Sequence, residues 1–246
     1  MSTAVENLVG LTAPQALGVL LSSLQEVQEV RLAECRPLPA LQVRLDFTEA
    51  ERGVFEKALD LRLRTGLSFW DAALLTLPQV PEAVRLLDAA MVHVSFRGRE
   101  RRLAWASAIA GGIERACAGF SAASDANLAF LSEVVCCGGL LRHLPMVDFH
   151  ASKSDPNRRI VTAVAERIFP RGAILLESGE SYHAYGTELL SESDFRTFIG
   201  RALLFAPIVD RAYLAHQLIE GRCALRLTPG GGKSCTPTVL AVLAGR

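Results

Sequence analysis

The residues that could carry out chemistry lie in the second half of the chain, where apolar segments end in polar side chains. Asp148 and His150 close an apolar run that starts at Leu140. Residues i and i+2 of a β-strand point to the same face, so this carboxylate and this imidazole are expected to project together. Such a pair can hold a divalent metal ion. The alternative is that Asp148 caps the next turn and His150 is exposed.

Ser181 and His183 have the same spacing on a second predicted strand. A hydroxyl and an imidazole on one strand face can hydrogen-bond to the oxygens of a phosphate. The neighbouring residues do not form the nucleophile elbow of a serine hydrolase, because position 183 is His where that motif has Gly. The pair on its own is a weak indication of a site.

Two further charged residues follow apolar segments. Asp210 comes after Ile208-Val209, and it either adds a carboxylate to the site or caps the helix that follows. Arg226 lies on a predicted strand with its side chain opposite those of Leu225 and Leu227. It forms either a surface salt bridge or a contact with phosphate oxygens, which a guanidinium can bind in a bidentate manner.

Residues 230–234 (GGGKS) invite comparison with the phosphate-binding loop of ATPases. That motif needs a glycine at the position occupied by Leu227, and it precedes a helix. Here a strand is expected next, over residues 238–243, so the segment is interpreted as a flexible hairpin.

The densest basic cluster covers residues 96–102 (FRGRERR). It is interpreted either as a solvated turn before the next element or as a surface that contacts phosphates of a nucleic-acid strand. The residues concerned are Arg97, Arg99, Arg101 and Arg102.

The elements that must position these side chains follow the order strand, helix, strand, strand, helix, strand. Periodicity, turn signals and caps such as Ser191 predict them. This order predicts an α+β fold with helices on one face of a sheet. The ranges expected are 140–150, 157–168, 173–178, 181–186, 191–204, 211–220, 223–229 and 238–243.

The first half is expected to be mostly helical, which divides the chain into residues 1–137 and 138–246. The first 35 residues are interpreted as a loop and a helix, and residues 40–47 as a strand. Thr48 and Glu51 form a capping box for a helix that ends at Gly66. Further helices are expected over 69–77, over 81–93 and through most of 103–137.

Composition limits the class of protein. The 246 residues contain 26 Lys and Arg against 26 Asp and Glu, and half are apolar. This excludes a disordered chain and a uniformly basic nucleic-acid coat, although a local basic groove stays open. The six cysteines form no Cys-x-x-Cys pair, no secretory signal is visible, and no apolar run reaches the ~18 residues that span a bilayer. A cytoplasmic protein with free thiols and no membrane contact is expected.

The order of these motifs resembles the archaeo-eukaryotic primase superfamily, the primase-polymerases. Their three motifs are Asp-x-Asp, Ser-x-His and apolar-Asp, on a sheet like that of an RNA-recognition motif. The segments HLPMVDF, SGESYHAYG, IVDRAYLAH and ALRLT are similar to a divergent subgroup with a single aspartate in the first motif. The segment GLSFWDAALL (66–75) is similar to the amino-terminal half of that subgroup. The resemblance covers residues 138–246 and implies an antiparallel sheet of that kind with helices on one face.

The resemblance also implies a metal site. Asp148 matches the first carboxylate of the first motif, Asp210 matches the third-motif carboxylate, and His150 stands where the family has its second Asp. The chemistry implied is phosphoryl transfer with two divalent ions. An imidazole in place of a carboxylate weakens Mg²⁺ binding and favours Mn²⁺, Co²⁺ or Zn²⁺. The expected cofactor is therefore Mn²⁺ or Mg²⁺, held by Asp148, His150 and Asp210.

The other implied roles concern the nucleotide. Ser181 and His183 match the motif that binds the phosphates of the incoming nucleoside triphosphate, with His183 in the catalytic set beside the two aspartates. Arg226 lies where some members place a basic nucleotide contact.

Three functions follow as hypotheses. The first is a nucleotidyltransferase that makes or extends short primers on single-stranded DNA, helped by a helicase or another replication or defence protein in trans. The second is a catalytically degenerate relative that binds nucleotide or nucleic acid without turnover, as His150 suggests. The third is a helical adaptor joined to an α+β interaction domain with no site.

Overall fold

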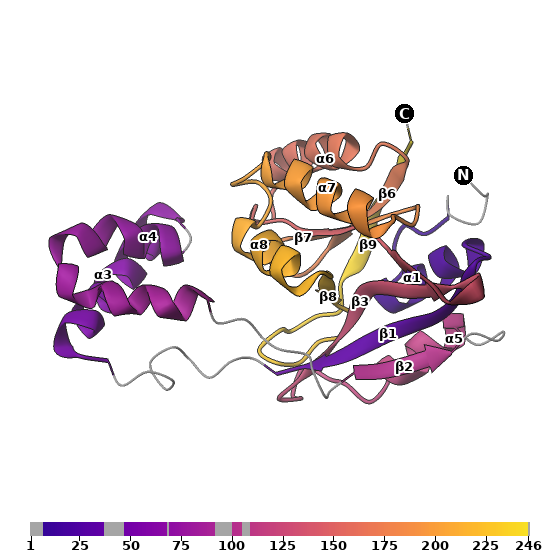
Figure 1. Ribbon diagram of the computed structural model, residues 1–246, viewed down its shortest axis with the longest axis horizontal. Helices are drawn as coiled ribbons and strands as arrows, with labels where there is room; N and C mark the ends of the chain where they lie inside the picture. Colours follow the sequence, from indigo (N-terminus) through magenta and orange to yellow (C-terminus); the bar gives the residue numbers. More distant parts are fainter. Residues whose placement is uncertain (1–6, 37–46, 68, 92–99, 105–108, 246) are drawn as a thin grey trace. The chain divides into compact units, whose positions relative to one another are not determined.

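The computed structural model describes residues 7–36, 47–67, 69–91, 100–104 and 109–245 (Figure 1). The chain divides into two compact units. The larger combines Met1–Arg36 with Phe96–Arg246, and the smaller is Pro37–Ser95. The division expected between residues 137 and 138 falls inside the larger unit, where β3 (Asn127–Cys136) is hydrogen-bonded to β4 (Leu140–His143).

One sheet of the larger unit has the predicted alternation of strands and helices. Its order is β5-β7-β6-β9, and all its pairs are antiparallel. An isolated bridge between Phe149 and Val209 adds a short fifth segment to this sheet, beside β5. The last segment of the β-α-β-β-α-β unit therefore pairs with the first, as in an RNA-recognition-motif-like sheet, and the predicted α+β class is confirmed. The elements are β5 (Met146–Asp148), α6 (Asp155–Ile168), β6 (Gly172–Glu177), β7 (Tyr182–Gly186), α7 (Glu192–Leu203) and β9 (Thr238–Ala244).

The second sheet has the order β2-β1-β3-β4, and β8 also pairs with β3. Helices α1 and α5 pack against each other beside it. The η3 turn joins β3 to β4, and α8 leads into β8. The bounds are α1 (Ala13–Ser23), β1 (Val27–Cys35), β2 (Glu100–Ala104), α5 (Ile109–Cys117), η3 (Cys137–Gly139), α8 (Arg211–Glu220) and β8 (Ala224–Arg226).

The prediction of helix was wrong for β1 and β3. The central residues of β3 are buried without a break on both faces, so its sequence lacks the alternation that marks a half-exposed strand. The segment of β1 mixes charged and apolar residues, and it reads as a continuation of the preceding helix. Pairing between the two strands overrides these local patterns.

The smaller unit is helical where the structure describes it. The capping box is confirmed, because Thr48 N donates to Glu51 Oε2 at 2.8 Å and Glu51 N donates to Thr48 Oγ1 at 3.3 Å. Gly66 ends the helix with φ of 72°, a conformation that glycine adopts without strain. The predicted strand 40–47 lies outside the described residues except for Phe47. The elements are α3 (Glu49–Thr65), α4 (Phe69–Thr76), η1 (Leu77–Gln79) and the 3₁₀ helix η2 (Pro81–Met91).

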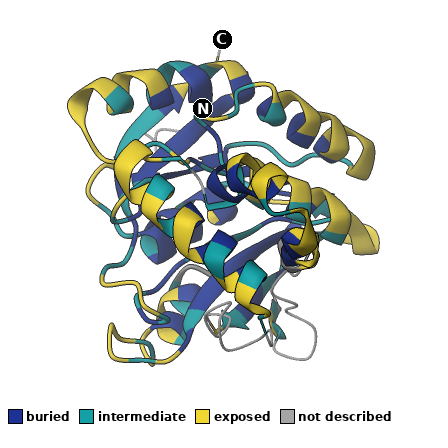
Figure 2. Cartoon of the chain, turned by 90° about the vertical axis from the view of Figure 1, so that its left-hand side faces the viewer, coloured by how far each residue is buried: buried dark blue, intermediate teal, exposed yellow. Residues whose placement is uncertain are grey.

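Burial follows the layers of the larger unit. Figure 2 shows the strands mostly buried and the outer faces of the helices exposed. A continuous apolar cluster includes side chains from both sheets, such as Phe130 of β3 and Leu175 of β6. Within the described ranges, no helix combines the length and apolar character needed to cross a membrane.

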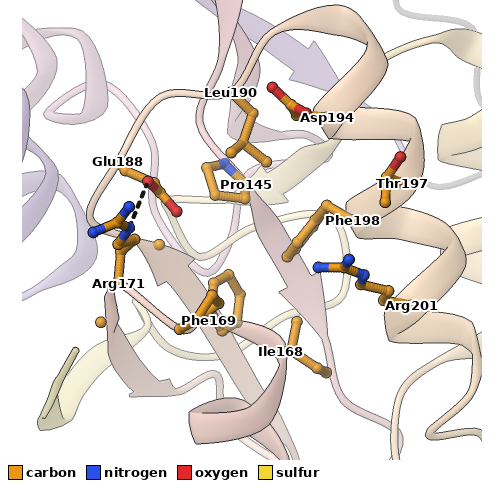
Figure 3. A pocket seen from close by; sticks show the side chains of 13 residues that line it. Pro145, Ile168, Phe169, Arg171, Glu188, Leu190, Asp194, Thr197, Phe198 and Arg201 are labelled. Carbon is orange, nitrogen blue, oxygen red and sulfur yellow. Dashed lines mark ion pairs between the residues drawn. The ribbon is translucent and has the colours of Figure 1, made fainter. Parts of the chain in front are cut away.

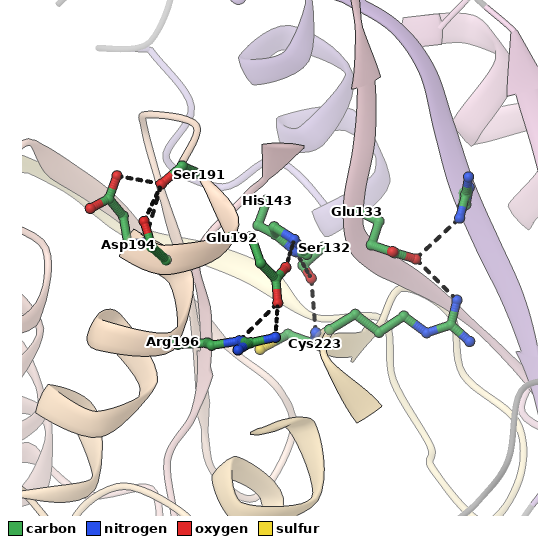
Figure 4. A network of polar contacts seen from close by, with 11 residues as sticks. Ser132, Glu133, His143, Ser191, Glu192, Asp194, Arg196 and Cys223 are labelled. Atoms are coloured by element: carbon green, nitrogen blue, oxygen red, sulfur yellow. Dashed lines mark hydrogen bonds and ion pairs between the residues drawn. The ribbon is translucent and has the colours of Figure 1, made fainter. Parts of the chain in front are cut away.

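A buried histidine links β3, β4 and α7 (Figure 4). His143 is 1% exposed, and its ring stacks on Phe195 with 4.2 Å between centroids. Its Nε2 atom lies 2.9 Å from Glu192 Oε2, and its Nδ1 atom lies 3.4 Å from Ser132 Oγ. Ser132 Oγ also accepts a hydrogen bond from Cys223 N at 2.8 Å. The His143 ring therefore connects two strands of the second sheet, β3 and β4, with helix α7.

This histidine predicts acid-sensitive stability. Burial lowers the pKa of His143 below its usual value, against the opposing effect of Glu192. A lowered folded-state pKa contributes stability above the unfolded value of about 6.5, and this stability is lost as the pH falls below it. The Tm of the wild-type protein should fall between pH 7 and pH 5, whereas His143→Gln should show a smaller fall from a lower starting Tm. The exposed-site variant His150→Gln is the control, and equal slopes for His143→Gln and wild type would contradict the assignment.

Candidate active site

Asp148 and His183 lie opposite each other where β5 pairs with β7. His183 Nε2 is 3.6 Å from Asp148 Oδ1, which is longer than a hydrogen bond. The His183 side chain is 7% exposed and that of Asp148 is 30% exposed. The carboxylate is therefore open to a ligand, and the imidazole forms the wall behind it.

Asp210 lies opposite Asp148, next to the bridge that adds the short fifth segment to the sheet. Asp210 N donates a hydrogen bond to the Asp148 carbonyl at 2.9 Å, on one side of the Phe149–Val209 bridge. Directly opposed residues of an antiparallel pair point to the same face, so the two carboxylates face one side. Asp210 Oδ1 also accepts from Tyr213 N at 2.9 Å, as the N-cap of α8. Both predicted roles of Asp210 therefore fit its position, since its Oδ2 has no hydrogen bond within the described chain.

The surroundings shift the protonation of the two facing groups. Burial and the Asp210 carboxylate raise the pKa of Asp148 to about 8, against the lowering effect of Lys233 and Arg226. Burial, with the same two cations, lowers the pKa of His183 to about 3. His183 is therefore neutral at neutral pH, and its Nδ1 is buried with no partner among the residues described.

Arg226 acts as a clamp at the end of β8. Its Nη1 donates to the carbonyls of Thr228 at 2.9 Å and of Cys235, and its Nη2 donates to the Ser178 carbonyl at 2.5 Å. These bonds tie the segment after β8 to the end of β6. The predicted surface salt bridge is not seen among the described residues. The guanidinium charge lies close enough to Asp148 and His183 to shift both pKa values.

Two predicted site residues have other contacts. The Ser181 hydroxyl donates a hydrogen bond to the Phe149 carbonyl, which joins the start of β7 to the end of β5. Only the lone pairs of this hydroxyl oxygen can therefore contact a ligand. His150 is exposed, its backbone N donates to the Ile208 carbonyl at 2.9 Å, and its side chain has no polar contact within residues 109–245. The structure therefore does not bring His150 to the two aspartates as a third ligand.

Lys233 is a candidate site residue that the sequence did not indicate. Gly230 and Lys233 exchange backbone hydrogen bonds of 2.9 and 3.0 Å. The two glycines between them have φ of 57° and 81°, which fits the left-handed centre of a tight two-residue hairpin. This turn brings the Lys233 charge close enough to affect the pKa of both Asp148 and His183. The feature of the sequence that could have indicated Lys233 is its place beside a glycine pair, shortly after the strand that carries Arg226.

The predicted basic patch is only partly described, since Arg97 and Arg99 lie outside the described residues. Arg101 and Arg102 lie on β2 and form ion pairs of 3.8 Å with Glu34 and 4.0 Å with Glu29. Strands β1 and β3 separate β2 from β8, a distance of about 14 Å at the usual strand spacing. These two arginines are therefore neutralised in part and lie apart from the Arg226 strand.

The arrangement combines two carboxylates on one face with two cations beside them. Among the residues described, no cluster of three or more His, Cys, Asp or Glu side chains forms a metal-ligand set. Mg²⁺ commonly uses one or two carboxylates and takes its other oxygens from water and substrate phosphates. Asp148 and Asp210 fit that pattern for one cation, while Lys233 and Arg226 can offset the charge of a bound phosphate.

A family model described as archaeo-eukaryotic primase 1D-like (AEP-like) matches residues 113–235, which is half of the chain and includes Asp148, His183, Asp210 and Lys233. No curated protein and no solved structure matches the chain.

Proposed function

The chain belongs to the archaeo-eukaryotic primase 1D-like family, and from this premise we propose that it makes or extends short primers on single-stranded DNA. The family is one of primase-like nucleotidyltransferases, which implies binding of nucleoside triphosphates and nucleic acid. The observation that carries the proposal is the meeting of Asp148 and Asp210 on one face, beside His183 and Lys233. A helicase or another replication or defence protein acting in trans is part of the same proposal.

Asp148 and Asp210 would together hold a divalent cation, Mg²⁺ or Mn²⁺. The pKa of Asp148 is raised in part by Asp210, and a cation held by both groups removes that repulsion. When bound, it supplies positive charge for the phosphates of the nucleotide. Because His150 is exposed and apart from polar partners in the described chain, hard oxygen ligands define this site, and it suits Mg²⁺ as well as Mn²⁺.

The chain's own residues would position the nucleotide. His183 is neutral and buried behind Asp148, so its Nε2 can donate a hydrogen bond to a phosphate oxygen without carrying a charge. Lys233 would add an exposed, flexible cation, and Arg226 a fixed one. We also propose that the strand of DNA contacts Arg97, Arg99, Arg101 and Arg102, the basic patch of residues 96–102.

Lys233 provides a test of nucleotide positioning. Lys233→Ala should raise the KM for the nucleoside triphosphate about tenfold and lower kcat less than about threefold, because a surface cation contributes mainly to binding. Lys233→Arg should restore most of the affinity. The control is Lys153→Ala, since Lys153 pairs with Glu177 at 2.6 Å. Unchanged kinetics in Lys233→Ala would remove Lys233 from the site.

The second candidate is a degenerate family member that binds nucleotide or single-stranded DNA without turnover. Two observations favour it: the His150 side chain has no polar contact within residues 109–245, and no three-membered ligand set occurs in the described chain. Its binding of DNA would weaken steeply with added salt.

One experiment separates the two candidates. Purified protein is incubated with a single-stranded DNA template and all eight nucleotides, in Mg²⁺ and separately in Mn²⁺, with Asp148→Ala in parallel. Product that requires Asp148 supports the polymerase. Absence of product in both metals, with nucleotide binding retained, supports the degenerate binder instead.

A further inference from the structure

A cavity of about 310 Å³ (Figure 3) is lined by Pro145, directly before β5, and by Gly186, the last residue of β7. Asp148 lies at the other end of β5. The cavity is lined by the end of α6, the start of β6, the end of β7 and one face of α7. Gly186, which lines it, comes three residues after His183 on β7, about 10 Å along an extended strand. The cavity is therefore separate from the carboxylate site, although the same strand runs to both.

The floor of this cavity is apolar and preformed. Phe169 and Phe198 meet with 5.3 Å between ring centroids, and Pro145, Ile168 and Leu190 complete the apolar lining. A Cβ atom on Gly186 would lie 2.6 Å from Pro145 Cγ and 3.0 Å from Phe169 Cδ1. The glycine thus lets Pro145 and Phe169 pack closely against β7. A cavity of this size and lining can take one large apolar side chain.

The charged side chains at the rim of the cavity differ in whether they have an ion-pair or hydrogen-bond partner. Arg171 pairs with Glu188 at 3.8 Å, and Asp194 Oδ2 accepts from the Ser191 hydroxyl at 2.6 Å. Arg201 lines the cavity beside Phe198 (Figure 3) and has no ion pair or hydrogen bond within residues 109–245. An arginine without a partner at the edge of an apolar cavity is complementary to a carboxylate.

We propose that this cavity binds a short peptide segment of a partner protein, one that carries an apolar side chain close to a carboxylate. The apolar side chain fills the space over Phe169 and Phe198, and the carboxylate pairs with Arg201. A polyphosphate would bring several negative charges towards the rim carboxylates of Glu188 and Asp194, whereas a single carboxylate can pair with Arg201 alone. The charge pattern therefore favours a peptide over a nucleotide. The proposal does not depend on the nucleotidyltransferase activity.

The test uses the full chain and an array of nine-residue peptides. Each peptide has one Leu or Phe and one Glu or Asp, spaced one to four residues apart, and matched peptides carry Lys or Ser instead. Peptides that bind are then titrated by fluorescence polarisation against wild type, Arg201→Glu, Arg201→Lys and Arg167→Glu. Arg167 is an exposed α6 residue outside the lining, and its reversal changes the net charge by the same amount.

The expected result is binding of the acidic apolar peptides alone. Arg201→Glu should weaken it at least about tenfold, Arg201→Lys less, and Arg167→Glu less than about twofold, because a charge-assisted contact is lost only in the first. Equal binding by the Lys or Ser peptides, equal binding by Arg201→Glu, or no binding by any peptide would overturn the proposal. Weaker ATP binding in Arg201→Glu than in Arg167→Glu would also overturn it, in favour of a nucleotide.

Discussion

Asp210→Ser should abolish nucleotidyl transfer and leave the fold intact. Asp210 caps α8 through Oδ1, and its carboxylate lies near enough to Asp148 to raise the pKa of that group. Serine caps a helix about as well as aspartate, so this variant removes the carboxylate and keeps the cap. We expect the rate of primer synthesis to fall at least about a thousandfold, equal to about 4 kcal/mol of transition-state stabilisation. The measurement is initial rate at saturating nucleotide, with Tm recorded for each variant.

Two further variants complete this series. Asp210→Ala removes both the carboxylate at the site and the cap of α8. Loss of a cap costs about 1 kcal/mol, so the Tm of this variant should fall by about 2–4 °C. Asp125→Asn changes an exposed aspartate outside the site and should leave both rate and Tm unchanged. A rate for Asp210→Ser within tenfold of wild type would show that Asp210 is only a helix cap.

Asp148→Asn should stabilise the metal-free protein while it removes activity. Burial and Asp210 raise the pKa of Asp148 from 3.8 to about 8, so the ionised carboxylate is unfavourable in the folded state at neutral pH. With 30% of the side chain exposed, solvent screens part of this effect, and we expect a gain of about 1–2 kcal/mol. This corresponds to a Tm about 3–6 °C higher at pH 7.

The pH dependence of this gain has a defined sign. A folded-state pKa above the unfolded value means that the stability of wild type is complete below about pH 4 and is lost as the pH rises towards 8. The Tm difference between Asp148→Asn and wild type should therefore grow from pH 5 to pH 8 and then level off. Added Mg²⁺ or Mn²⁺ should raise the Tm of wild type alone. A difference that does not vary with pH would contradict the account of Asp148.

Much of the fold could be predicted because local signals and tertiary pairing agree. The caps at Thr48 and Ser191 and the glycine ends at Gly66 and Gly221 mark helices α3, α7 and α8 as the structure has them. Strands β6 and β7 are short apolar runs between turns, and both were predicted. Strands β1 and β3 were missed because only their pairing identifies them as strands, and no local sequence pattern shows which segments pair with each other.

The residues of the candidate site also fall into those that local spacing predicted and those that depend on tertiary contacts. Period-two spacing on predicted strands pointed to Asp148 and His183, and the structure places them directly opposite each other on neighbouring strands. The same rule pointed to His150, but β5 ends at Asp148 and His150 is exposed beyond it. Lys233 depends on the geometry of a hairpin, and the clamp by Arg226 depends on carbonyls distant in sequence. Spacing alone contains neither kind of information.

Template-directed incorporation of labelled nucleotides on single-stranded DNA tests the central claim most directly. Wild type, Asp148→Asn and Asp210→Ser are compared with Mg²⁺ and with Mn²⁺ on templates of defined composition. The account predicts product from wild type whose composition is complementary to the template, and no product from either variant although both are folded. Product from either variant at a rate near that of wild type, or no wild-type product in both metals, would contradict it.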